Sequence, residues 1–95
     1  MNNRIIIDGG RIGSREELFV QLRSQLQQQT GISDILSGSN LDALHDALTS
    51  ITTYTVIEIH SETQLSAMLG DYWKRVLWVI NDCLDENDNL ALEMH

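Results

Sequence analysis

The sequence has no proline, a single cysteine and no apolar run near the ~18 residues of a membrane span. One cysteine, Cys83, cannot close an intrachain disulfide, and it excludes zinc sites of the Cys₂His₂ or Cys₄ kind. The first residues carry only Ile5-Ile6-Ile7 before Asp8, too short an apolar stretch for a secretory signal. These absences predict a cytoplasmic protein.

Basic residues are also scarce: 6 Lys and Arg stand against 14 Asp and Glu, for a net charge of −8. Neither the stretch from Ser24 to Trp73 nor the last twenty residues contains a lysine or arginine. Such a chain repels phosphate backbones and anionic membranes, which excludes direct nucleic-acid binding and membrane association as expected functions. It attracts basic proteins instead.

The apolar content is sufficient for a core, because 42% of the 95 residues are hydrophobic. The length predicts one domain over residues 1–95. Apolar and β-branched runs predict strands at 4–8, 54–59 and 90–94, the first of them buried on both faces. Periodicity and capping patterns predict four helices, at 15–28, after Asn40, from a capping box at Ser61 to Gly70, and from Asp71 onward.

This β-α-α-β-α-α-β order predicts a small α/β domain, because strands joined by helical crossovers lie parallel in one sheet. In the last helix we expect Trp73 to face the core and Trp78 to widen the same apolar face. Gly9 to Gly13 lacks the spacing of a phosphate-binding loop and is expected to form a turn. Cys83 is expected to be a buried, inert thiol, and neither His60 nor His95 indicates a site.

The helix after Asn40 is distinctive because it places two carboxylates on one side. Asp42 and Asp46 are four residues apart, with His45 beside them, while Leu44 and Leu48 face the core. Like charges at this spacing cost the helix ~0.2–0.5 kcal/mol, which a sequence selected for stability alone would avoid. Two interpretations remain open from the pattern: a solvated polar face, or a site for a partner.

The segment Gly38-Ser39-Asn40-Leu41-Asp42-Ala43-Leu44-His45-Asp46-Ala47-Leu48-Thr49 resembles the signature of the barstar family, intracellular inhibitors of the bacterial ribonuclease barnase. The resemblance extends over nearly the whole chain and implies a barstar-like fold with a three-stranded parallel sheet and about four helices. It also implies a protein without catalytic activity that blocks the active site of a barnase-type ribonuclease with an acidic helix. The implied partner-binding residues are Leu36, Gly38, Asn40, Asp42, His45, Asp46 and Asp82, with Asp46 deepest in the phosphate-binding cleft.

Two departures from the family pattern bear on the target. Ile35-Leu36-Ser37 stands where the family has aromatic residues, and His45 stands where a tryptophan occurs. The expected partner is a basic extracellular-type or toxin ribonuclease, and the protein is taken as a monomer. No cofactor and no metal are expected.

Two alternatives remain. One is a barstar-fold interaction module or antitoxin for a different basic nuclease or toxin. The other is a small enzyme or metal binder centred on His45, with Asp42 and Asp46 as the accompanying carboxylates.

Overall fold

The computed structural model describes residues 3–30 and 41–95. Four helices and a three-stranded parallel sheet confirm the predicted α/β fold and its element order. None of the described helices has the length and apolar character to cross a membrane. The elements in chain order are β1 (Asn3–Asp8), the 3₁₀ turn η1 (Gly9–Arg11), α1 (Arg15–Thr30), α2 (Leu41–Thr49), β2 (Thr55–His60), α3 (Glu62–Leu69), α4 (Asp71–Glu86) and β3 (Leu90–Met94).

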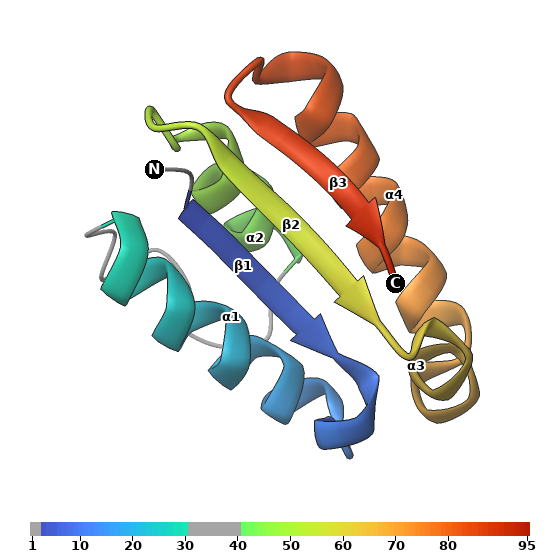
Figure 1. Cartoon of the computed structure of the whole chain (residues 1–95). Coiled ribbons are helices and arrows are strands. Elements are labelled where there is room, and N and C mark those ends of the chain that lie inside the picture. Colours follow the sequence, from blue (N-terminus) through green and yellow to red (C-terminus); the bar gives the residue numbers. More distant parts are fainter. Residues whose placement is uncertain (1–2, 31–40) are drawn as a thin grey trace.

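The sheet has the order β1-β2-β3, with β2 in the centre. Ile5 pairs with Ile57, which pairs in turn with Leu92 on β3. In Figure 1 the helices α2 and α4 lie behind the sheet, and α1 lies beside β1. No described helix covers the other face of the sheet in this view, and we call it the open face, although Val56 and Glu58 of the central strand are buried there among neighbouring side chains.

This arrangement corrects the prediction that the first strand is buried on both faces. In β1, Ile5 and Ile7 are fully buried, whereas Ile6 between them is exposed. A strand covered by helices on one face only buries every second side chain. The burial of β1 therefore alternates, although three isoleucines in a row hide this alternation in the sequence. Only the central strand β2 is buried along nearly its whole length.

Helix α4 also departs from the prediction. Its core face is formed by Trp73, Val76, Ile80 and Cys83, which are all buried. Trp78 is 69% exposed and contributes nothing to that face, because it lies about 140° around the helix from Trp73. An exposed tryptophan on a helix is a feature that the core does not explain.

Two helix starts behave differently although both sequences show a capping box. At α1 the Glu17 backbone N–H donates to Ser14 Oγ at 3.3 Å, as predicted. At α3 the predicted cap is wrong: Ser61 has a φ of 58°, in the left-handed region, and its side chain makes no cap hydrogen bond. Here the chain passes close to η1, where a Cβ on Gly9 would lie 2.4 Å from the Ser61 carbonyl oxygen.

The free edge of β1 is covered by a side chain from α1. The Gln25 amide accepts from the Ile6 backbone N–H and donates to the Ile6 carbonyl, both at 2.6 Å. A primary amide here forms the two hydrogen bonds that one residue of a further strand would form.

Candidate functional site

The helices α2 and α4 pack against each other (Figure 1), and both carry acidic residues. Leu44, Ala47 and Leu48 are buried and hold α2 against the core. The intervening positions face outward, and they include Asp42 and Asp46, which are exposed. We call Asp42, His45, Asp46, Asp82 and Glu86 the acidic face.

His45 connects the two helices within this face. Its Nε2 lies 2.8 Å from Asp82 Oδ2 and 3.2 Å from Glu86 Oε2. An ionised carboxylate can only accept, so Nε2 carries the hydrogen and donates it toward both groups. The side chain of His45 is therefore a bridge from α2 to two carboxylates one turn apart on α4.

A buried asparagine fixes the end of α2 against the end of α4. Asn87 Nδ2 donates to the carbonyls of Leu48 and Ile51 at 3.0 and 2.9 Å. Its Oδ1 accepts from the Asn89 backbone N–H at 3.0 Å. The amide thereby supplies donors to one carbonyl in the last turn of α2 and to one just after the helix.

Cys83 lies beneath the acidic face and is buried as predicted. Burial raises the pKa of its thiol to about 12, and the nearby carboxylates of Asp82 and Glu86 act in the same direction. The thiol is therefore protonated at neutral pH and is not a nucleophile.

Of the site residues predicted from the sequence, the structure joins His45 to Asp82 across the two helices, and Asp42 and Asp46 lie exposed on the same helix as His45. The other three, Leu36, Gly38 and Asn40, lie outside the described residues. Glu86 was not predicted. Its spacing of four residues from Asp82 is a signal in the sequence that could have identified it, once α4 was known to lie beside α2.

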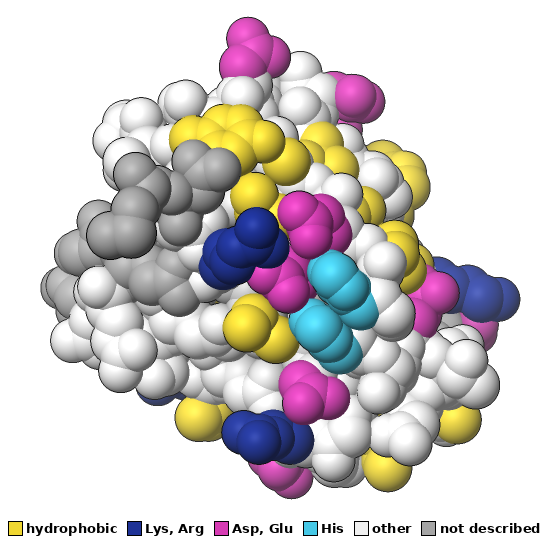
Figure 2. All heavy atoms as spheres, in the orientation of Figure 1, with side chains coloured by type: hydrophobic (Ala, Val, Ile, Leu, Met, Phe, Trp, Pro, Cys, Tyr) yellow, Lys and Arg dark blue, Asp and Glu magenta, His cyan; other side chains and the backbone are white. Residues whose placement is uncertain are grey.

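A second polar cluster lies on the open face of the sheet, where Figure 2 shows two histidines beside acidic and basic side chains. The imidazoles of His60 and His95 stack in parallel, with centroids 4.5 Å apart and planes 4° apart. His60 Nε2 lies 3.0 Å from Glu58 Oε1, and Arg4 pairs with the other oxygen of Glu58. The Arg4 hydrogen bond lowers the pKa of Glu58, and the bond from His60 adds to this effect. No sequence pattern predicts this cluster, because the register of the strands brings its members together.

Two groups of described residues bring a histidine and carboxylates close enough to act as metal ligands: His45, Asp82 and Glu86, and Glu58, His60 and His95. The first differs from the group considered from the sequence, since His45 meets carboxylates of α4 and not those of its own helix. In the second, an imidazole binds a metal through a lone pair in its ring plane. Because two stacked parallel planes do not meet, no single ion fits both rings as they lie.

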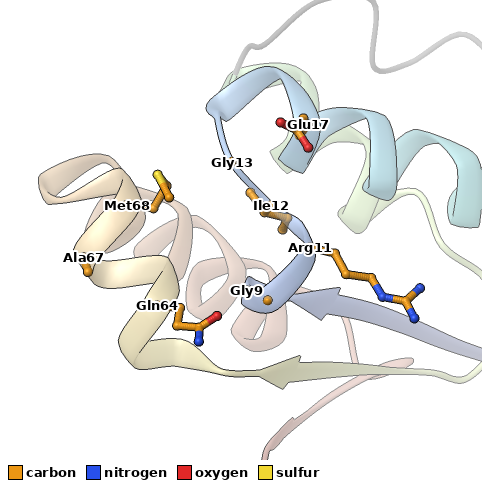
Figure 3. A pocket seen from close by; sticks show the side chains of 9 residues that line it. Gly9, Arg11, Ile12, Gly13, Glu17, Gln64, Ala67 and Met68 are labelled. Atoms are coloured by element: carbon orange, nitrogen blue, oxygen red, sulfur yellow. The ribbon is translucent and has the colours of Figure 1, made fainter.

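The glycine-rich segment after β1 lines a hollow of about 610 Å³ between η1, α1 and α3 (Figure 3). The predicted turn is confirmed, and Asp8 Oδ1 accepts from the Gly10 backbone N–H at 2.9 Å. A Cβ on Gly13 would lie 3.0 Å from Glu17 Oε1, which places a carboxylate directly over the segment. That charge opposes the binding of a phosphate at the segment.

These features define a small α/β protein whose acidic groups gather on an open surface formed by two helices. The chain belongs to the Barstar family: it matches the family described as Barstar (barnase inhibitor) over residues 2–95. No curated protein matched the chain. The description of this family is that of an inhibitor and not of a catalyst.

Proposed function

We propose that this protein inhibits a basic ribonuclease of the barnase type by covering its active site with the acidic face. The observation that carries the proposal is that His45 joins α2, which exposes Asp42 and Asp46, to Asp82 and Glu86 on α4, in a chain of the Barstar family. The partner of the inhibitor is thus another protein. The inhibitor itself catalyses no reaction, and it acts in the cytoplasm.

The physical basis is the resemblance between a row of carboxylates and a row of phosphates. A ribonuclease cleft that binds RNA is lined with cationic side chains, and carboxylates on a rigid helix offer the same charge and similar acceptor oxygens. The face is held rigid by the buried residues of α2 and by the Asn87 amide at its end. Preorganised charges lose little conformational entropy on binding.

The deepest contact in this arrangement is Asp46, and its removal is the sharpest test. We expect Asp46→Ala to abolish stoichiometric inhibition of a barnase-type ribonuclease. The expected loss is at least about 30-fold, because removing one member of a desolvated charge pair costs about 2–5 kcal/mol, a scale measured in the barnase–barstar complex itself. Thermal stability should stay unchanged or rise slightly, since the variant removes a like-charge pair within α2.

A matched control removes one carboxylate elsewhere. Glu16 is exposed on α1, away from the acidic face, so Glu16→Ala should inhibit like the unmodified protein. A large drop in the melting temperature of Asp46→Ala would identify Asp46 as structural. If the unmodified protein does not inhibit the ribonuclease, the proposed target is wrong. The partner would then be a different basic nuclease or toxin that binds the same acidic face.

A further inference from the structure

Helix α4 exposes a tryptophan, Trp78, outside the acidic face. Trp78 is 69% exposed, the highest value among the large hydrophobic side chains in the described part of the chain. Exposing an indole to water is unfavourable at ~25 cal/mol for each Å² of apolar surface, so the core gains nothing from this residue. A tryptophan in such a position is typical of a contact made with another molecule.

Trp78 lies beside a hollow of about 420 Å³ between α2 and α4. Leu41 and Val79 give the hollow an apolar lining, and Asp42 of the acidic face also lines it. Because Trp78 and Asp82 are four residues apart on α4, they share one side of that helix. The hollow is thus continuous with the acidic face at its Asp42 end.

We propose that Trp78 is the apolar anchor of the partner interface and that the hollow beside it receives an uncharged apolar side chain of the basic partner protein. This inference rests on the proposed function and deepens it. The charges around the hollow decide the kind of group that enters. Lys74 and Arg75 line it together with Trp78, so a lysine or arginine of the partner is repelled there and is attracted to the carboxylates instead.

In this arrangement the charged and the apolar residues make different contributions to binding. The carboxylates guide and hold the cations of the partner, whereas Trp78 supplies buried apolar area at the edge of the same contact. Interfaces concentrate binding energy in a few such aromatic anchors next to fully desolvated polar pairs. The structure shows no comparable element in the rest of the acidic face, whose described side chains are all polar.

The test compares Trp78→Ala with the unmodified protein, measuring both inhibition of a barnase-type ribonuclease and binding to it by calorimetry. We expect Trp78→Ala to weaken both by at least about tenfold. The melting temperature should not fall, because the side chain is mostly exposed. Trp78→Phe, which keeps an aromatic ring, should retain more affinity than Trp78→Ala.

The matched control is Val20→Ala on α1, since Val20 is 57% exposed and distant from the acidic face. Unchanged affinity of this control with weakened Trp78→Ala supports the proposal. Equal affinity of Trp78→Ala and the unmodified protein overturns it while the inhibitor function stands. If the unmodified protein neither binds nor inhibits the ribonuclease, both proposals fail for this partner.

Discussion

At the scale of single residues, the clearest electrostatic effect belongs to Glu58 on the open face of the sheet. Its carboxylate accepts from Arg4 and from His60, and the pKa of Glu58 lies below its ordinary value of 4.5 because these bonds favour the charged form. The same contact with Glu58 raises the pKa of Arg4. The pair joins β1 to the central strand through side chains as well as through the backbone ladder.

This shift predicts how stability depends on pH. A carboxyl with a lowered pKa in the folded state contributes stability above its ordinary pKa, and that contribution is lost as the pH falls through the lowered value. We therefore expect Glu58→Gln to be less stable than the unmodified protein at pH 7. The difference should shrink below about pH 4.5. Urea denaturation at a series of pH values measures it.

The control for this prediction is Asp88→Asn, a change of the same kind at an exposed carboxylate in the turn after α4. Its stability should follow that of the unmodified protein at every pH. A difference between Glu58→Gln and the unmodified protein that stays constant down to pH 3 would mean that packing, not charge, accounts for the effect.

At the scale of elements, the acidic face depends on how α2 is fixed to α4. The His45 bridge joins them in the middle, and Asn87 joins them at the end. Asn87 is buried, and its amide donates to the carbonyls of Leu48 and Ile51, the first of which also accepts from the Ile51 backbone N–H at 3.4 Å. The orientation of Asp46 therefore depends on a residue that lies outside both the acidic face and the hollow.

Replacing this asparagine should be costly. Asn87→Ala removes the amide donor of the Ile51 carbonyl and leaves the Leu48 carbonyl with only the longer bond from the Ile51 N–H, which costs about 1–3 kcal/mol of unfolding free energy. Asn81→Ala is the matched control on α4, because the Asn81 amide is exposed and bonds only to the Leu77 carbonyl of its own helix. Its effect should stay within about 0.5 kcal/mol. Chemical denaturation compares the two, and equal effects would contradict the role assigned to Asn87.

The elements also show what the sequence can and cannot predict. Runs such as Leu90–Met94 and the stripe of α1 predicted strands and helices correctly, because local period and capping depend on neighbours in the sequence. The open face of β1 and the exposure of Trp78 were predicted wrongly, because they depend on which faces the helices cover. The burial of a side chain depends on how helices and strands pack against one another, and the spacing of apolar residues in the sequence does not encode that packing.

The candidate site divides in the same way. Asp42 and Asp46 could be placed together from their spacing alone, and the resemblance of the segment to the barstar signature indicated their role. The contacts of His45 with Asp82 and Glu86 join residues 37 and 41 positions apart, and no local pattern encodes them. The meeting of His60 with His95 likewise follows from the register of β2 and β3.

At the scale of the whole molecule, the net charge of −8 acts on a partner before contact is made. The field of an acidic protein raises the encounter rate with a basic one, and dissolved salt screens that field. The Debye length falls from about 30 Å at 0.01 M ionic strength to about 3 Å at 1 M. Long-range attraction is therefore nearly absent at the higher concentration.

We expect the association rate with a basic ribonuclease to fall by at least about tenfold over this range of salt. The dissociation rate should change much less, because it depends on close contacts such as those of Asp46 and Trp78. Stopped-flow measurements at several salt concentrations separate the two rates. An association rate that is independent of salt would contradict electrostatic steering.

The amide of Gln25 on the edge of β1 also limits how molecules of this kind can assemble. A sheet with two open edges can add strands from other chains on both sides without end. Here the Ile6 backbone on the β1 edge of the described sheet is already bonded to the Gln25 side chain. A strand from another molecule would have to displace this amide before it could pair with β1, so the contact opposes growth of a fibre from this edge.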